Sequence, residues 1–137
     1  MGRMKIFIDG ASRGNPGPAA AGAVFQDARG KVLKSLSQAI GIATNNTAEY
    51  CALILALQEA LMMGAAEVEV FTDSELVARQ FNGEYKIKEA SLKTLYLLAV
   101  HLKKGFKKIL VKHIPREENK LADAQANKAL DGGNLFL

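Results

Sequence analysis

The chain has 137 residues, of which 49% are hydrophobic, values typical of one globular domain with its own core. Its single cysteine, Cys51, excludes an internal disulfide and a cysteine-rich zinc site and favours a reducing compartment, while no apolar run approaches the ~20 residues needed to cross a bilayer. With 18 basic and 14 acidic residues the net charge is only +4, and we expect a cytoplasmic, monomeric protein that does not associate with membranes.

The first third of the chain predicts an antiparallel sheet. Three strands are expected, at residues 4–9, 20–26 and 31–42. A turn-rich loop at 10–19 joins the first two strands, and Gly30 supplies the positive φ of a hairpin between the second and third.

The remaining chain alternates helices with strands. Helices are expected at 48–63, 74–82, 92–104 and 119–130, and strands at 68–72 and 109–114. Such alternation indicates strands added in parallel. The sequence therefore predicts an α/β fold with a five-stranded mixed sheet, three strands antiparallel and then parallel ones, flanked by helices in the order β-β-β-α-β-α-α-β-α. Residues 1–131 would form one domain and 132–137 an apolar tail.

Four acidic residues stand where a purely structural role is hard to assign. Asp9 and Asp73 each end an apolar run, Glu49 lies in the first turn of an apolar helix, and Asp123 lies in an alanine-rich one. Carboxylates gathered in one site repel each other and lose hydration, so cations normally neutralise them. A site with only oxygen ligands suits Mg²⁺ or Mn²⁺. The four acids therefore predict a metal-dependent phosphoryl-transfer site.

Each acid also has a simpler explanation. Asp73 could cap the helix that follows it, Asp9 could form a turn with Gly10, and Glu49 could favour the helix dipole. Asp123 could be a solvated helix residue. However, all four lie on elements that can converge, which favours a shared site over four separate coincidences.

The sequence resembles type 1 ribonuclease H over nearly its whole length. The resemblance is carried by four segments in the family's order, at residues 6–17, 44–49, 72–74 and 113–123. It implies an endonuclease that hydrolyses the RNA strand of RNA/DNA hybrids and leaves 5′-phosphate and 3′-hydroxyl ends. It also implies two Mg²⁺ ions, with Mn²⁺ as a substitute, held by Asp9 between Asp73 and Glu49, with Asp123 completing the set.

Further roles follow from the same resemblance. His113, ten residues before Asp123, matches a histidine that assists proton transfer or product release, although a strand-end histidine without a task is the alternative. Contacts with nucleic acid are expected from Gly10, Ser12, Arg13, Asn15, Thr44, Asn45, Asn46, Tyr85 and Asn119. Because such contacts reach backbone and 2′-hydroxyl groups, little sequence preference is expected.

The sequence departs from many bacterial members at residues 82–91, where it lacks their basic, tryptophan-bearing protrusion. Weak hybrid affinity and activity on double-stranded RNA are compatible with this compact form. Two alternatives to the nuclease remain: a non-catalytic module that binds hybrid or double-stranded RNA, and another nuclease of the superfamily. The tail residues Leu135, Phe136 and Leu137 are expected to fold back on the domain, with docking to a protein partner as the alternative.

Overall fold

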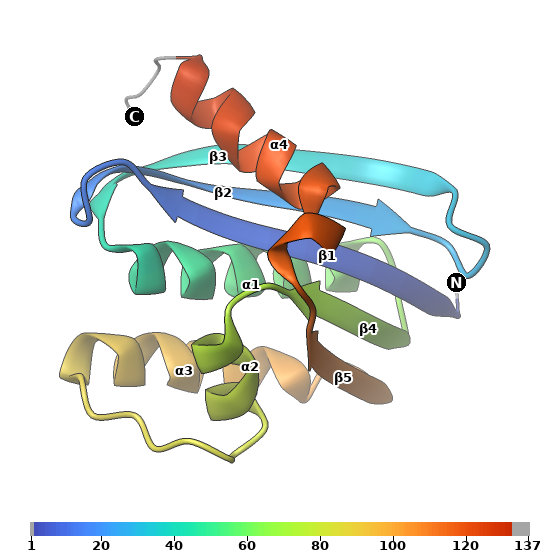
Figure 1. Ribbon diagram of the computed structural model, residues 1–137. Coiled ribbons are helices and arrows are strands. Elements are labelled where there is room, and N and C mark those ends of the chain that lie inside the picture. Colours follow the sequence, from blue (N-terminus) through green and yellow to red (C-terminus); the bar gives the residue numbers. More distant parts are fainter. Residues whose placement is uncertain (1, 133–137) are drawn as a thin grey trace.

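The structure is a computed structural model that describes residues 2–132. Its elements occur in the predicted order (Figure 1). They are β1 (Arg3–Ser12), β2 (Gly17–Gln26), β3 (Val32–Ala43), α1 (Asn45–Met62), β4 (Glu67–Thr72), α2 (Glu75–Phe81), α3 (Ala90–Lys103), β5 (Lys108–His113), a short 3₁₀ helix (Arg116–Glu118) and α4 (Lys120–Asp131). The expected fold of residues 133–137 lies outside the described residues.

The five strands form one mixed sheet in the order β3-β2-β1-β4-β5. The pairs β1–β2 and β2–β3 are antiparallel, whereas β1–β4 and β4–β5 are parallel. Helix α1 packs on one face of the sheet with α3 beyond it, and α4 crosses the opposite face over β2, β1 and β3 (Figure 1). The predicted fold class, strand directions and element order are confirmed.

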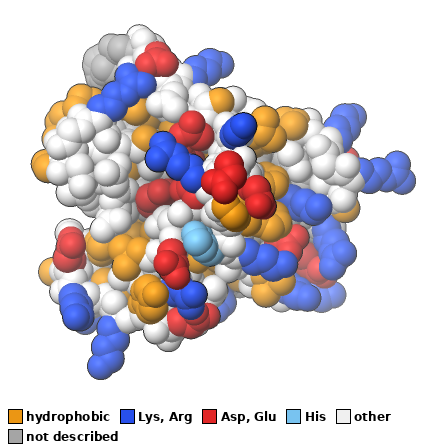
Figure 2. Space-filling model, in the orientation of Figure 1, with side chains coloured by type: hydrophobic (Ala, Val, Ile, Leu, Met, Phe, Trp, Pro, Cys, Tyr) orange, Lys and Arg blue, Asp and Glu red, His pale blue; other side chains and the backbone are white. Residues whose placement is uncertain are grey.

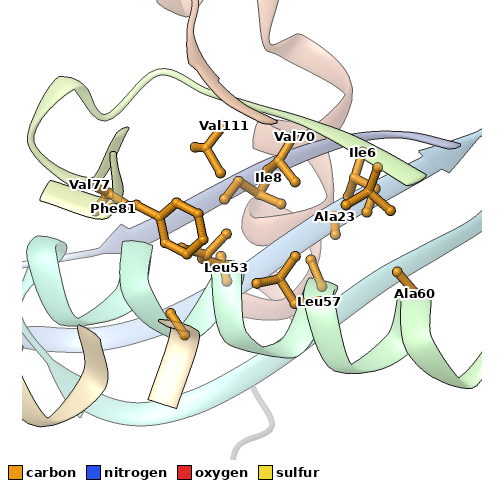
Figure 3. Packing of buried hydrophobic residues seen from close by; sticks show 14 of the residues in the cluster. Ile6, Ile8, Ala23, Leu53, Leu57, Ala60, Val70, Val77, Phe81 and Val111 are labelled. Atoms are coloured by element: carbon orange, nitrogen blue, oxygen red, sulfur yellow. The ribbon is translucent and has the colours of Figure 1, made fainter. Parts of the chain in front are cut away.

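Helix α1 begins at a side-chain cap and buries an apolar face. The Thr44 hydroxyl accepts a hydrogen bond from the Thr47 backbone N–H at 3.2 Å, which satisfies one free amide of the first turn. Leu53 and Leu57 of α1 pack against Ile6 and Ile8 of β1 in the core (Figure 3). Three small residues of α1 are buried as well, and their size lets the helix lie close to the sheet: Ala52, Ala56 and Ala60.

Strand β1 is longer than predicted and places Asp9 differently. The turn-rich composition of residues 10–19 predicts a loop, but Gly10, Ala11 and Ser12 continue β1 by pairing with β2, and β2 already begins at Gly17. Parallel pairing with β4 still ends at Ile8, opposite Thr72. Asp9 was expected to end its strand, and this expectation is wrong. It is an internal residue of β1, immediately beyond the part of the strand that pairs with β4.

Two glycines allow helices to approach the sheet closely. A Cβ atom at Gly10 would clash with the backbone of Ala48 and Glu49 in α1. A Cβ atom at Gly22 of β2 would lie 2.5 Å from the Ala122 carbonyl oxygen and the Ala126 amide nitrogen of α4. Real Cβ atoms do not tolerate such contacts, so both helices depend on a residue without a side chain in the strand beneath them.

Candidate active site

Three of the four predicted acids meet at one place. Asp9 of β1, Glu49 of α1 and Asp73 after β4 each offer one carboxylate oxygen, and these oxygens lie within 4.8 Å of one another. Asp9 is 5% exposed and Glu49 9%. Acidic side chains gather at the centre of the face shown in Figure 2, with lysine and arginine side chains around them. Side chains from distant parts of the sequence thus form one carboxylate cluster.

Glu49 is held by the backbone of β1. The Gly10 N–H donates to Glu49 Oε1 at 2.8 Å. This hydrogen bond is made possible by the close approach of α1 at Gly10, where a side chain would clash. The expectation that Glu49 lies in the first turn of its helix is wrong, because α1 begins at Asn45 and places Glu49 in the second turn. This turn is fixed against β1, and the Glu49 carboxylate lies near that of Asp9, the residue before Gly10.

Asp123 joins the cluster from α4, on the other face of the sheet. Its carboxyl group lies close enough to that of Asp9 to raise the Asp9 pKa, and its Oδ2 atom accepts from Asn127 Nδ2 at 3.2 Å. The close packing of α4 over Gly22 brings this helix near enough for the contact. The structure therefore brings all four predicted acids together, with Asp123 bound to the cluster through Asp9.

The surroundings of the cluster disfavour the ionised form of its carboxyl groups. Burial, the nearby charge of Asp73, and the hydrogen bond and charge of Asp123 raise the pKa of Asp9 from 3.8 to about 8. Burial and the charges of Asp9 and Asp73 raise the pKa of Glu49 well above its usual 4.5. The Arg116 guanidinium lowers both values, but as the weakest contribution in each case.

The donor set fits a divalent cation. All ligand atoms are carboxylate oxygens, which hard cations such as Mg²⁺ and Mn²⁺ prefer. The raised pKa values of Asp9 and Glu49 show that proton or cation binding would relieve the repulsion. Asp9, Glu49 and Asp73 have the spacing to share such an ion.

His113 ends β5 and is paired in register with Thr72, the residue before Asp73. Its side chain is exposed. The structure therefore places it at the same end of the parallel strands as the acids, at the surface. Its role in proton transfer or product release stays a prediction.

The predicted nucleic-acid residues of the β1–β2 loop are joined to the start of α1. Asn45 Oδ1 accepts from the Ser12 N–H at 2.9 Å, and Asn15 Oδ1 accepts from the Asn45 N–H at 2.8 Å. Thr44 caps the same helix. These side chains therefore build a fixed edge beside Gly10. Their turn and capping roles leave their proposed contacts with substrate as predictions.

Three further predicted nucleic-acid residues occupy two separate places: Arg13 contacts α4, and Asn46 and Tyr85 line a groove. Arg13 Nη2 reaches α4 and donates to Asp131 Oδ1 at 2.7 Å. Asn46 and Tyr85 line a groove of about 530 Å³ between α1, α2 and the α2–α3 connection. The structure thus places Tyr85 apart from the β1–β2 loop, on the other side of the start of α1.

Asn119, a predicted nucleic-acid residue, has its side chain in the interior. It is 1% exposed, and its Nδ2 donates to the Ile8 carbonyl at 2.8 Å and to Asp73 Oδ2 at 3.5 Å. In this position the side chain contacts Asp73 of the acid cluster and does not face solvent. Its expected contact with nucleic acid receives no support from this placement.

Three contributors to the site were not singled out from the sequence. Arg116 supplies the positive charge nearest the acids, Asn127 binds Asp123, and Gly22 lets α4 approach. Arg116 lies inside the 113–123 segment, so its position was a usable signal. Asn127 lies four residues after Asp123, the spacing at which helical side chains meet.

Comparison with known proteins agrees with this architecture. Residues 7–129 match the family described as "Reverse transcriptase-like". The sequence is 34% identical to a ribonuclease H of Chromohalobacter salexigens, over 96% of this chain and 86% of the relative. It is 44% identical to ribonuclease HI of Halobacterium salinarum, over 95% of this chain and 65% of that protein. The chain therefore belongs to the type 1 ribonuclease H family.

Solved structures extend the comparison to three dimensions. RNase H1 from Halobacterium salinarum superimposes with a TM-score of 0.94 at 43% identity, covering 96% of this chain and 99% of that one. LC11-RNase H1, solved in complex with an RNA/DNA hybrid, gives 0.90 at 45% identity and covers 94% and 97%. The chain spans only 36% of the mycobacterial protein Rv2228c, with which it is 47% identical over 93% of its own length. No helix among residues 2–132 is long and apolar enough to cross a membrane.

Proposed function

We propose that this protein is an endonuclease that hydrolyses the RNA strand of RNA/DNA hybrids with two Mg²⁺ ions, leaving 5′-phosphate and 3′-hydroxyl ends. The observation that carries the proposal is the carboxylate cluster of Asp9, Glu49 and Asp73, whose oxygens lie within 4.8 Å of one another. The solved complex of LC11-RNase H1 with a hybrid supports the substrate class. Mn²⁺ would substitute for Mg²⁺, because both prefer oxygen ligands.

The four acids would hold the ions, with Asp9 between Asp73 and Glu49 and with Asp123 completing the set. When bound, the ions supply activation of water and neutralisation of the charge that builds on the phosphate. The Gly10 N–H holds the Glu49 carboxylate in place. His113, exposed beside the end of β4, would carry a proton or assist the release of product.

Substrate recognition would use the fixed edge at the start of α1. Backbone amides of residues 10–15 and the amide side chains of Asn45 and Asn46 are suited to 2′-hydroxyl groups, which distinguish RNA from DNA in a shallow minor groove. Thr44 and Arg13 would contact phosphates. These groups do not read base edges, so little sequence preference is expected. In line with the expectation from the sequence, we also propose that the enzyme is monomeric and cytoplasmic.

A cleavage assay tests this proposal directly. End-labelled RNA/DNA hybrid, double-stranded RNA and double-stranded DNA would be incubated with the protein in Mg²⁺, in Mn²⁺ and in EDTA. The Asp73→Asn variant removes one ligand of the cluster. Glu69→Gln is its matched control, since Glu69 lies in β4, the strand that ends directly before Asp73, but pairs with Lys112. Analysis of product ends would identify the 5′-phosphate.

The proposal requires metal-dependent cleavage of the hybrid's RNA strand, lost in EDTA and in Asp73→Asn but kept in Glu69→Gln. Tight hybrid binding without cleavage would instead indicate a non-catalytic binding module. Equal cleavage of double-stranded RNA would widen the substrate class and retain the chemistry. Cleavage of double-stranded DNA would indicate another nuclease of the superfamily.

A further inference from the structure

A chain of hydrogen bonds links the fourth acid to the β1–β2 loop. Asn127 Nδ2 donates to Asp123 Oδ2 at 3.2 Å and to the Asp123 carbonyl at 3.1 Å. Asn127 Oδ1 accepts from Arg13 Nη2 at 3.3 Å, and the same nitrogen donates to Asp131 Oδ1 at 2.7 Å. Asp123, Asn127 and Asp131 are spaced by four residues, so they share one face of α4.

The orientation of the Asn127 amide follows from its neighbours. A guanidinium has only donors and an ionised carboxylate only acceptors. The amide oxygen must therefore face Arg13 and the NH₂ group must face Asp123. A flipped amide would place a donor against Arg13 and an acceptor against Asp123, and would lose both hydrogen bonds.

Asp123 needs such a partner because of where it lies. Its carboxyl group contacts that of Asp9, next to Glu49 and Asp73, and like charges repel. A helix side chain without a second contact could rotate away from the cluster into solvent. Asn127 supplies the only donor side chain that is hydrogen bonded to Asp123 within residues 2–132.

We infer that Asn127 is a positioning residue that holds the Asp123 carboxylate against Asp9, with Arg13 and Asp131 fixing its amide. This inference rests on the proposed function for its effect on turnover. Its structural part, that Asn127 is hydrogen bonded to Asp123 and so senses a cation bound by the acids, does not depend on that function. Since Arg13 belongs to the loop proposed to bind phosphate, the same hydrogen bonds connect that loop to Asp123.

Two variants and a control test the inference. Asn127→Asp keeps the size of the side chain but loses the donor to Asp123 and adds a repelling charge, and Asn127→Ala removes the amide altogether. Lys128→Ala is the control, because Lys128 is the next residue of α4 and its side chain is exposed. For each protein, kcat and KM on the hybrid, the melting temperature, and the side-chain NH₂ resonances of the ¹⁵N-labelled, hybrid-free protein during Mg²⁺ addition would be measured.

Both Asn127 variants should lower kcat by about tenfold, the size found for residues that orient metal ligands. KM should stay unchanged, because substrate contacts are retained. The NH₂ signal that disappears in Asn127→Asp should shift on Mg²⁺ addition to the wild type. An unchanged kcat in either folded variant, or an Asn127 signal that ignores Mg²⁺, would overturn the inference.

The two proposals can fail separately. If the wild type does not cleave hybrid, the proposed function fails and the NMR titration alone decides the inference. A shift of the Asn127 signal with Mg²⁺ would then support it, and no shift would reject it. If the wild type cleaves but the Asn127 variants behave as Lys128→Ala does, the nuclease stands and the positioning role fails.

Discussion

Acidic residues at the two ends of β4 have opposite surroundings. At the start of the strand, Glu67 lies 3.6 Å from Arg3, and Glu69 forms an ion pair with Lys112. At the other end, Asp73 forms no salt bridge with any residue in the described range 2–132; it lies beside Asp9 and Glu49 instead. The acids at the start of β4 form ion pairs with cations at the surface. Asp73 instead shares its site with two other acids, Asp9 and Glu49.

Helix α1 repeats this contrast along its length. Near its end, Glu59 Oε2 lies 2.5 Å from Lys34 Nζ. In its second turn, Glu49 is buried. Within residues 2–132 its carboxylate accepts a hydrogen bond from the Gly10 N–H alone. The folded chain therefore gathers negative charge at one end of the sheet at a cost in stability, which a bound cation would offset. Natural sequences tolerate such local conflict mainly at functional sites.

The largest effect should come from breaking the cluster. Asp73→Asn removes a ligand charge but keeps the size of the side chain, so the fold should be retained. Hydrolysis of the hybrid should fall by about a thousandfold, because metal ions contribute several kcal/mol of transition-state stabilisation and each 1.36 kcal/mol is tenfold in rate. Single-turnover cleavage in Mg²⁺ measures the loss. Glu69→Gln, at the paired end of the strand, should keep its activity.

The next effect concerns the stability of the metal-free protein. The pKa of Asp9 is raised from 3.8 to about 8, so between these values the folded state holds a proton that the unfolded state has lost. The free energy of unfolding should therefore fall as pH rises from about 4 to 8, by about 1 kcal/mol per pH unit. Urea unfolding in EDTA at several pH values measures this slope.

Two comparisons sharpen the pH experiment. Asp9→Asn removes one of the two groups with a raised pKa and should make the dependence shallower, with Glu49 supplying the remainder. Mg²⁺ should stabilise the wild type more at pH 8 than at pH 5, because the cation binds the deprotonated carboxylates. If the stability of the metal-free protein rises over the same pH range, burial and repulsion do not raise the pKa values of these acids.

The sequence predicted the fold because its local signals agree with one another. Apolar periodicity and the hairpin glycine Gly30 both indicated the observed elements. The error lay at both ends of the expected loop, residues 10–12 and 17–19, where glycine, serine and proline suggest a loop. Pairing with neighbouring strands keeps these residues in β1 and β2, and such pairing between distant segments overrides local turn preference.

The site was predictable for the residues that carry charge. Four acids on elements that could converge were visible in the sequence, and they meet in the structure. The packing that brings them together was not visible. That α4 passes over Gly22 depends on a close approach between segments a hundred residues apart, and the burial of Asn119 depends on its bond to the Ile8 carbonyl.

A smaller effect is expected at the exposed histidine. His113→Ala should slow turnover by about a hundredfold, the lower end of the range for a positioned proton-transfer group. The reaction should persist, because the carboxylate cluster is intact in this variant. Rates at saturating hybrid, measured from pH 6 to 9, would show the change. A loss as deep as that of Asp73→Asn would mean that His113 is indispensable to the chemistry.

The smallest effect should come from the paired end of β4. Arg3 is exposed where it meets Glu67, with 72% of its side chain accessible, and exposed ion pairs contribute less than about 1 kcal/mol because solvent screens them. Arg3→Ala should therefore shift the urea midpoint only slightly and leave hybrid cleavage unchanged. The comparison between the two ends of β4 requires this result: a strong loss of activity would show that the acid cluster depends on charges at the far end of the sheet, and the two ends would no longer be independent.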